Sequence, residues 1–83
     1  MRPVTARPPV ATWLSPRQLA AVREYVLGGS RAAAAAALGI ARGTVAVHLR
    51  RAYATLGVHR RADLVRWSLR AGVVEMDEWM EEE

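Results

Sequence analysis

Between residues 30 and 57 the chain reads SRAAAAAALGIARGTVAVHLRRAYATLG. The first part contains six consecutive alanines, and alanine has the highest helix propensity of any residue. The second part repeats apolar residues at helical spacing, namely Val45, Leu49, Ala52 and Leu56. Gly39 separates the two parts, and glycine is the usual residue where a helix ends in a tight turn. The pattern predicts two helices, over 31–38 and 42–56, joined by a short turn.

Two further helices flank this pair. The run Ser15-Pro16-Arg17-Gln18 places a capping serine before a proline at the first helical position and a glutamine at the third, which is typical of a helix start. We therefore predict a helix over 16–27, ended by Gly28. Another helix is predicted over 61–71, before Gly72. Its inward residues are expected to be Leu64, Val65 and Leu69.

Composition divides the chain into three parts. Residues 1–12 hold three of the four prolines together with Arg2 and Arg7, which predicts an extended arm rather than a signal peptide. Residues 13–74 hold the predicted helices, and residues 75–83 form an acidic tail with room for one or two helical turns. The expected fold is an all-α domain of four helices. The tail either stays solvated, folds back onto the basic surface, or docks on a protein.

Charge is distributed unevenly along the chain, whose net charge is +4. All twelve basic residues are arginine and precede Val74, where they face only two acids, whereas the tail has six acids and no base. This asymmetry favours a polyanionic partner, and a genome that uses arginine as its default surface residue is the alternative explanation. Cysteine is absent, which excludes disulfides and thiolate metal sites and fits a reducing compartment. The sequence contains no run of about 18 apolar residues, so no membrane span is predicted.

The predicted helix over 42–56 has an outward face without any acid. That face consists of Gly43, Ala46, Val47, Arg50 and Ala54. A helix with short side chains and arginines can enter a DNA major groove, which is about 12 Å wide. The alanine-rich helix before it offers Ala35 and Ala36 as small residues where the two helices cross. The pair is therefore interpreted as a helix-turn-helix.

Short motifs follow one another in a definite order from Leu14 to Val74. They are Leu14-Ser15-Pro16-Arg17, Gly28, Ser30, Leu38-Gly39-Ile40, Thr44-Val45, His48, Leu56-Gly57-Val58 and Arg61-Ala62-Asp63-Leu64. The ordered set resembles the LuxR/GerE-type helix-turn-helix domain. The resemblance implies a transcription regulator that binds double-stranded DNA at two half-sites, inserts the helix over 42–56 into the major groove, and forms a homodimer through the helix over 61–71.

The resemblance also implies residue roles. Base reading falls on Ala46, Val47 and Arg50. Contacts with DNA phosphates fall on Ser30, Arg31, Arg42, Thr44, His48 and Arg51. The dimer interface is expected at Arg66, Trp67, Arg70 and Ala71. The chain departs from the family pattern where a lysine is usual, at Ala46 and Thr55, and where a capping serine is usual, at Ala41. Arg42, Arg50 and Arg51 are expected to compensate for the lysines, and weak DNA affinity is the alternative. Either Thr44, as a cap, or water is expected to satisfy the first N–H groups of the helix.

A protein-interaction module is the alternative function. In that case the helix over 61–71 and the acidic tail around Trp79 bind the transcription machinery or another regulator. No enzyme is expected, because neither His48 nor His59 has a plausible carboxylate to orient it and no glycine-rich phosphate loop exists. No metal, cofactor, small-molecule ligand or membrane partner is expected, and the length leaves no room for a sensor domain. The expected location is the cytoplasm of a bacterium or of a phage-infected cell.

Overall fold

The computed structural model describes residues 13–80, in which all regular structure is helical. The helices are α1 (Pro16–Gly28), α2 (Arg31–Leu38), α3 (Arg42–Leu56), α4 (Arg61–Ala71) and α5 (Met76–Met80). The predicted all-α class is confirmed, and the four predicted helices are present, with α1 one residue longer at its end. The predicted arm with Arg2 and Arg7 lies outside the described residues, as do the last three glutamates.

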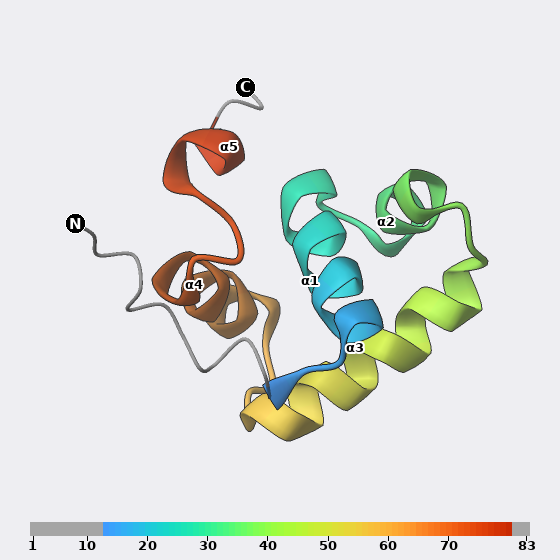
Figure 1. Ribbon diagram of the computed structural model, residues 1–83, viewed down its shortest axis with the longest axis horizontal. Coiled ribbons are helices and arrows are strands. Elements are labelled where there is room, and N and C mark those ends of the chain that lie inside the picture. Colours follow the sequence, from blue (N-terminus) through green and yellow to red (C-terminus); the bar gives the residue numbers. More distant parts are fainter. Residues whose placement is uncertain (1–12, 81–83) are drawn as a thin grey trace.

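Helix α1 is the centre of the fold. It contacts each of the other four helices, and Figure 1 shows α2 and α3 on one side of it and α4 and α5 on the other. The core comprises Leu14, Ala21, Val22, Val26, Ala34, Ala35, Val45, Leu49, Ala52, Leu64, Val65 and Val74. These side chains are mostly small, so the helices must approach closely to exclude water.

Two serines begin the first two helices as the sequence predicted. The Ser15 hydroxyl accepts a 3.1 Å hydrogen bond from the backbone N–H of Gln18, and the Gln18 side chain accepts one of 3.2 Å from the Ser15 backbone N–H. The Ser30 hydroxyl accepts a 3.0 Å bond from the Ala33 N–H. Both caps satisfy N–H groups that a helix start leaves without partners, and each is worth about 1 kcal/mol.

Helices α2 and α3 form the predicted helix-turn-helix. The turn is Gly39-Ile40-Ala41, in which Gly39 has a left-handed φ of 68°. The two helices are bent by 109° at this break, within the range of about 90–120° typical of the motif. No single helix among the described residues is long and apolar enough to cross a membrane. Helices α2 and α3 reach the length and apolar composition of a membrane span only when the two are counted together, across the bend between them.

Small residues bring α1 and α2 into close contact. A Cβ atom added to Gly28 would lie 2.8 Å from the Cβ of Ala33, closer than two carbons can approach without movement. Ala34 and Ala35 are buried in the core, whereas Ala36 is exposed. The prediction that Ala36 lies where the helices cross is therefore wrong, because the inward positions of α2 occur one residue earlier along the helix.

Helix α4 buries a polar residue. Ser68 is fully buried, and its hydroxyl oxygen has no hydrogen-bond partner among the described residues. The reason is its register: Ser68 follows Leu64 by four residues and Val65 by three, so it shares their inward face.

The beginning of the tail is part of the folded body. Val74 is 1% exposed and belongs to the core. One guanidinium nitrogen of Arg23, in α1, donates to the carbonyl of Val73 at 2.9 Å, and the other lies 2.6 Å from a carboxylate oxygen of Glu78 in α5. The tail folds back as one interpretation expected, but in residues 75–80 it meets α1 rather than the arginines of α3.

Candidate nucleic-acid interface

The outward face of α3 holds the three predicted base-reading residues. Arg50 is exposed, and Ala46 and Val47 are half-buried, so all three reach the surface. Gly43 and Ala54 continue the same face and are exposed. The inward face of the helix carries Val45, Leu49 and Ala52. Because these inward side chains hold α3 against the core, its small and cationic residues point outward. A helix that enters the DNA major groove requires this arrangement.

The start of α3 has no side-chain cap. Its N-cap is Ala41, whose carbonyl accepts the N–H groups of Thr44 and Val45 at 3.0 and 3.1 Å. The prediction that Thr44 caps the helix is wrong, because Arg42 already has helical backbone and Thr44 lies inside the first turn. The first N–H groups of α3 are therefore left for water or an anion, and helix starts of this kind bind phosphate.

The arginines of α2 and α3 have no acidic partner within residues 13–80. They are Arg31, Arg42, Arg50 and Arg51, and all four are exposed. Neither helix contains an acid. Among the other predicted phosphate contacts, Thr44 is exposed and His48 is half-buried. Ser30 is exposed, but its oxygen already caps α2, so its remaining contribution is the hydroxyl proton.

A hollow of about 330 Å³ opens beside this face, between α1, α2 and α3. It is lined by Tyr25, Arg31, Ala46, Leu49, Arg50, Tyr53 and His59. The folding of α2 against α3 thus brings Arg31 and Arg50 to one concave surface. No carboxylate of residues 13–80 lines it, so the hollow has the electrostatic character that attracts a phosphate group.

Three residues of this hollow were in no prediction: Tyr25, Tyr53 and His59. Burial raises the pKa of the Tyr53 phenol, and the neighbouring Tyr25 adds to the effect. The phenol therefore stays protonated near neutral pH and can donate a hydrogen bond to an anion. Tyr53 follows Arg50 by three residues on α3, and residues at this spacing are neighbours on a helix surface. The spacing could therefore have indicated that Tyr53 lies beside Arg50. Tyr25 comes from another helix, and no spacing along the chain relates it to Arg50.

Residues 12–68 match a family described as bacterial regulatory proteins, luxR family, also called GerE. The chain belongs to this family. The match covers more than half of the chain and includes all of α1, α2 and α3. Comparisons with curated proteins and with solved structures found no significant match.

Membership in the LuxR-type family makes the chain a DNA-binding regulatory protein. The match begins two residues before the predicted resemblance, at residue 12, and ends at residue 68 inside α4. The helix-turn-helix formed by α2 and α3 therefore lies entirely within the family domain, whereas α5 lies outside it.

The predicted dimer residues of this LuxR-type domain lie on one edge of α4. Trp67 is half-buried and, with Arg66 and Arg70, lines a hollow of about 220 Å³ that also includes Val58 and Asp63. Arg66 pairs with Asp63 at 3.4 Å. Ala71 is half-buried and does not line the hollow. The fold thus brings three of the four predicted interface residues together.

Within the described residues of the LuxR-type domain and its tail, no group of three or more histidines, cysteines or acids could hold a metal ion. His48 is half-buried on α3, and His59 lies between α3 and α4 on the rim of the hollow with Arg31 and Arg50. The surroundings of His59 are therefore cationic, which suits an anion better than a metal ion.

Proposed function

We propose that this protein is a sequence-specific transcription regulator that binds double-stranded DNA as a homodimer and reads the major groove with α3. The observation that supports the proposal best is the acid-free outward face of α3, on which exposed arginines have no acidic partner among residues 13–80. Guanidinium groups that contact DNA phosphates displace the counterions condensed on the DNA, and the release of these ions drives binding.

The residues of α3 divide into two roles by their position. Arg50 lies on the outward stripe with Ala46 and Val47, where a guanidinium can bind O6 and N7 of guanine and the small side chains can contact a thymine methyl. Arg42 and Arg51 flank that stripe and contact backbone phosphates. Arg31, at the first position of α2, contacts the phosphate that enters the hollow beside Arg50.

The homodimer forms through the α4 edge that contains Arg66, Trp67 and Arg70. A two-fold contact there places the same edge of each copy together and presents two copies of α3 to successive major-groove segments. Replacing Trp67 by alanine removes the largest side chain of this edge. Sedimentation of the variant is expected to shift toward monomer, and a profile equal to that of the unaltered protein contradicts the dimer assignment.

Selection of preferred sites from random duplex DNA tests the function directly. We expect a two-part site with half-sites about one helical turn apart. Arg50→Ala is expected to relax the base preference at one position of each half-site by about 1–3 kcal/mol, whereas Arg51→Ala weakens all sequences alike. If no site is enriched and Arg50→Ala has no effect on DNA affinity, the alternative function of a protein-interaction module replaces this proposal.

A further inference from the structure

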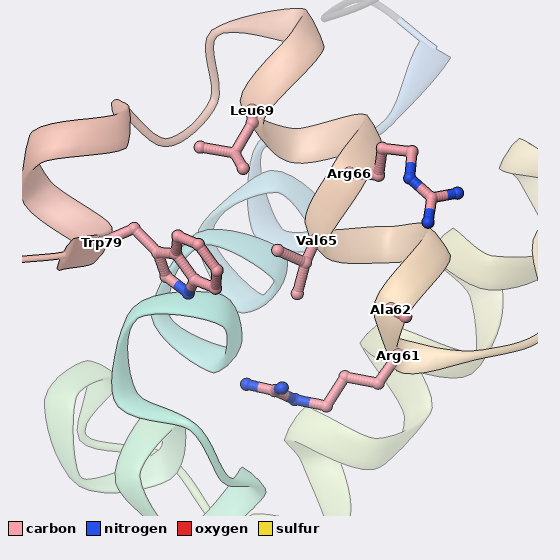
Figure 2. A pocket seen from close by; sticks show the side chains of 6 residues that line it. All are labelled: Arg61, Ala62, Val65, Arg66, Leu69 and Trp79. Carbon is pink, nitrogen blue, oxygen red and sulfur yellow. The ribbon is translucent and has the colours of Figure 1, made fainter.

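A second surface feature lies between α4 and α5. It is a groove of about 380 Å³ lined by Arg61, Ala62, Val65, Arg66, Leu69 and Trp79. Its Arg61 also lies over the Tyr25 ring, 5.2 Å from the ring centre, and Tyr25 lines the hollow beside α3. Figure 2 shows the Trp79 ring extending from α5 toward Val65, with Leu69 above and Arg61 below it. No residue of the groove belongs to α2 or α3, so a ligand can occupy it while α3 binds DNA.

The floor of the groove is apolar. Val65 is 8% exposed and marks the base, and Trp79 is 36% exposed and forms one wall. Exposed aromatic and aliphatic surface in a concave site is the usual centre of a protein–protein contact, because a single anchoring side chain can be desolvated there. Phosphates do not gain from an apolar floor, which argues against DNA as the occupant.

The wall formed by α5 is held in place before any ligand arrives. Arg23 donates two hydrogen bonds to the Glu78 carboxylate, at 3.2 and 2.6 Å, and one to the Val73 carbonyl. The Glu75 N–H donates to the same carboxylate at 3.0 Å. Trp79 directly follows Glu78, so these contacts position its ring. A preformed wall lowers the entropy lost when a partner binds.

Among the described residues, the polar groups that line the groove are all donors. Arg61 and Arg66 offer guanidinium N–H groups, Trp79 offers its indole N–H, and none of these side chains has an acceptor. Asp63 contacts Arg66 at 3.4 Å, but both belong to an exposed pair, which contributes little. Carboxylates of a partner therefore complement this groove.

We propose that the groove between α4 and α5 docks an acidic amphipathic helix of another protein. An aliphatic side chain of that helix packs between Trp79, Val65 and Leu69. Its flanking carboxylates bind Arg61 and Arg66. This is helix-in-groove recognition, in which residues spaced by three, four and seven positions supply the anchors. The proposal adds a protein partner to the DNA-binding role. It does not use the arginines of α3, and it shares Arg66 with the proposed dimer edge.

A synthetic peptide tests the groove. The probe is a fluorescein-labelled helical peptide with leucines spaced three and four apart and glutamates elsewhere. Two control peptides replace either all leucines by alanine or all glutamates by lysine. In anisotropy titrations of the full chain, only the leucine–glutamate peptide is expected to bind saturably. In NMR spectra with ¹⁵N-labelled protein, the Trp79 indole N–H is expected to shift more than those of Trp13 and Trp67.

Charge reversal separates the groove from general attraction. Arg61→Glu alters the first residue of α4, where an acid is favourable to the helix, so α4 persists. Arg17→Glu makes the same charge change at an exposed site on α1. We expect Arg61→Glu to weaken peptide binding about tenfold or more, because its carboxylate would face the carboxylates of the peptide. Arg17→Glu is expected to leave it nearly unchanged.

Leu69→Ala and Trp79→Ala test the apolar floor and are also expected to weaken the peptide. Arg50→Ala is expected to retain full peptide affinity, so the failure of DNA binding and the failure of the groove remain distinguishable. The proposal is overturned if no peptide binds saturably, or if Arg61→Glu and Arg17→Glu weaken peptide binding equally. If no peptide binds and Leu69→Ala loses self-association, the groove is a contact with a second copy. If no peptide binds and Leu69→Ala loses DNA binding, the groove belongs to the DNA interface.

Discussion

The two sides of α1 use arginine in opposite ways. On one side, α2 and α3 carry Arg31, Arg42, Arg50 and Arg51 with no acid between them. On the other side, α4 and α5 carry acids as well, and the ion pairs within residues 13–80 all lie there or reach α5 from α1. These pairs are Arg23–Glu78, Arg60–Asp63 and Arg66–Asp63.

This difference separates charges that serve the fold from charges that serve a partner. The pair of Arg23 with Glu78 ties α5 to α1, whereas no guanidinium on α3 has an acidic partner in the part of the chain that the structure describes. Leaving exposed arginines unpaired costs little, because surface ion pairs contribute only about 0–1 kcal/mol. The same arginines gain much more when they meet the closely spaced charges of DNA.

The largest expected effect is on DNA binding and its dependence on salt. Arg42→Ala with Arg51→Ala removes two unpaired charges of α3, and we expect the slope of log affinity against log salt to fall by about 2. Arg17→Ala with Arg60→Ala removes two charges elsewhere and is the matched control. Its slope should be nearly unchanged. Equal slopes for the two double variants, measured by anisotropy at several salt concentrations, contradict the division between the two sides.

A smaller effect concerns how α2 is attached to α1. Gly28→Ala places a methyl group 2.8 Å from the Cβ of Ala33, and overpacking of this kind costs about 1–3 kcal/mol. The control is Gly43→Ala, since a Cβ at Gly43 meets nothing within 4 Å and alanine stabilises a helix by about 1 kcal/mol relative to glycine. Urea unfolding measures both changes. A stability for Gly28→Ala equal to that of the unaltered protein means that the helices move apart without cost.

Next in size is the capping of α3. Ala41→Ser adds a hydroxyl at an N-cap position whose backbone is already extended, at φ −73° and ψ 150°. We expect the free energy of unfolding to rise by about 1 kcal/mol, because serine can accept an N–H of the first turn. Ser30→Ala removes the corresponding cap of α2 and should lower it by about as much. Thermal unfolding followed by circular dichroism distinguishes these outcomes, and a decrease for Ala41→Ser would count against an uncapped start.

The smallest effect is the release of α5 by acid. The hydrogen bond from Arg23 lowers the pKa of Glu78, and the Glu75 N–H lowers it further. Because the docked pKa is below the undocked one, docking is favoured above the undocked pKa and is lost as pH falls through the docked pKa. The NMR signal of the Trp79 indole N–H should move in that acidic range. In Glu78→Gln this movement should disappear, and α2 and α3 contain no acid that could cause a similar change.

Local signals were sufficient to predict the helices. The serine caps at Ser15 and Ser30 and the glycine at Gly39 act within a few residues, so the sequence specifies where those helices begin and end. The outward stripe of α3 followed from the helical period alone. The exposed state of Arg50 agrees with that period.

The features that the sequence left unpredicted involve contacts between distant parts of the chain, whereas the errors at Ala36 and Thr44 are local ones of helix register. Ser68 is buried because α1 covers the inward face of α4, and nothing near Ser68 in the sequence indicates that an alcohol will lack a partner there. The tail docks through Arg23, fifty-five residues before Glu78. The hollow beside α3 includes Tyr25 from α1, and its composition depends on how α1 crosses α3.

The face of α3 holds its positive charge in guanidinium groups only, because the chain has no lysine. A guanidinium stays protonated throughout the pH range in which proteins are stable, and acetylation, which neutralises lysine amines, has no target on this surface. Lysine acetylation therefore cannot weaken the attraction between this face and a polyanion. Any control over it must act by covering the face, by changing the amount of protein, or by changing the surrounding ions.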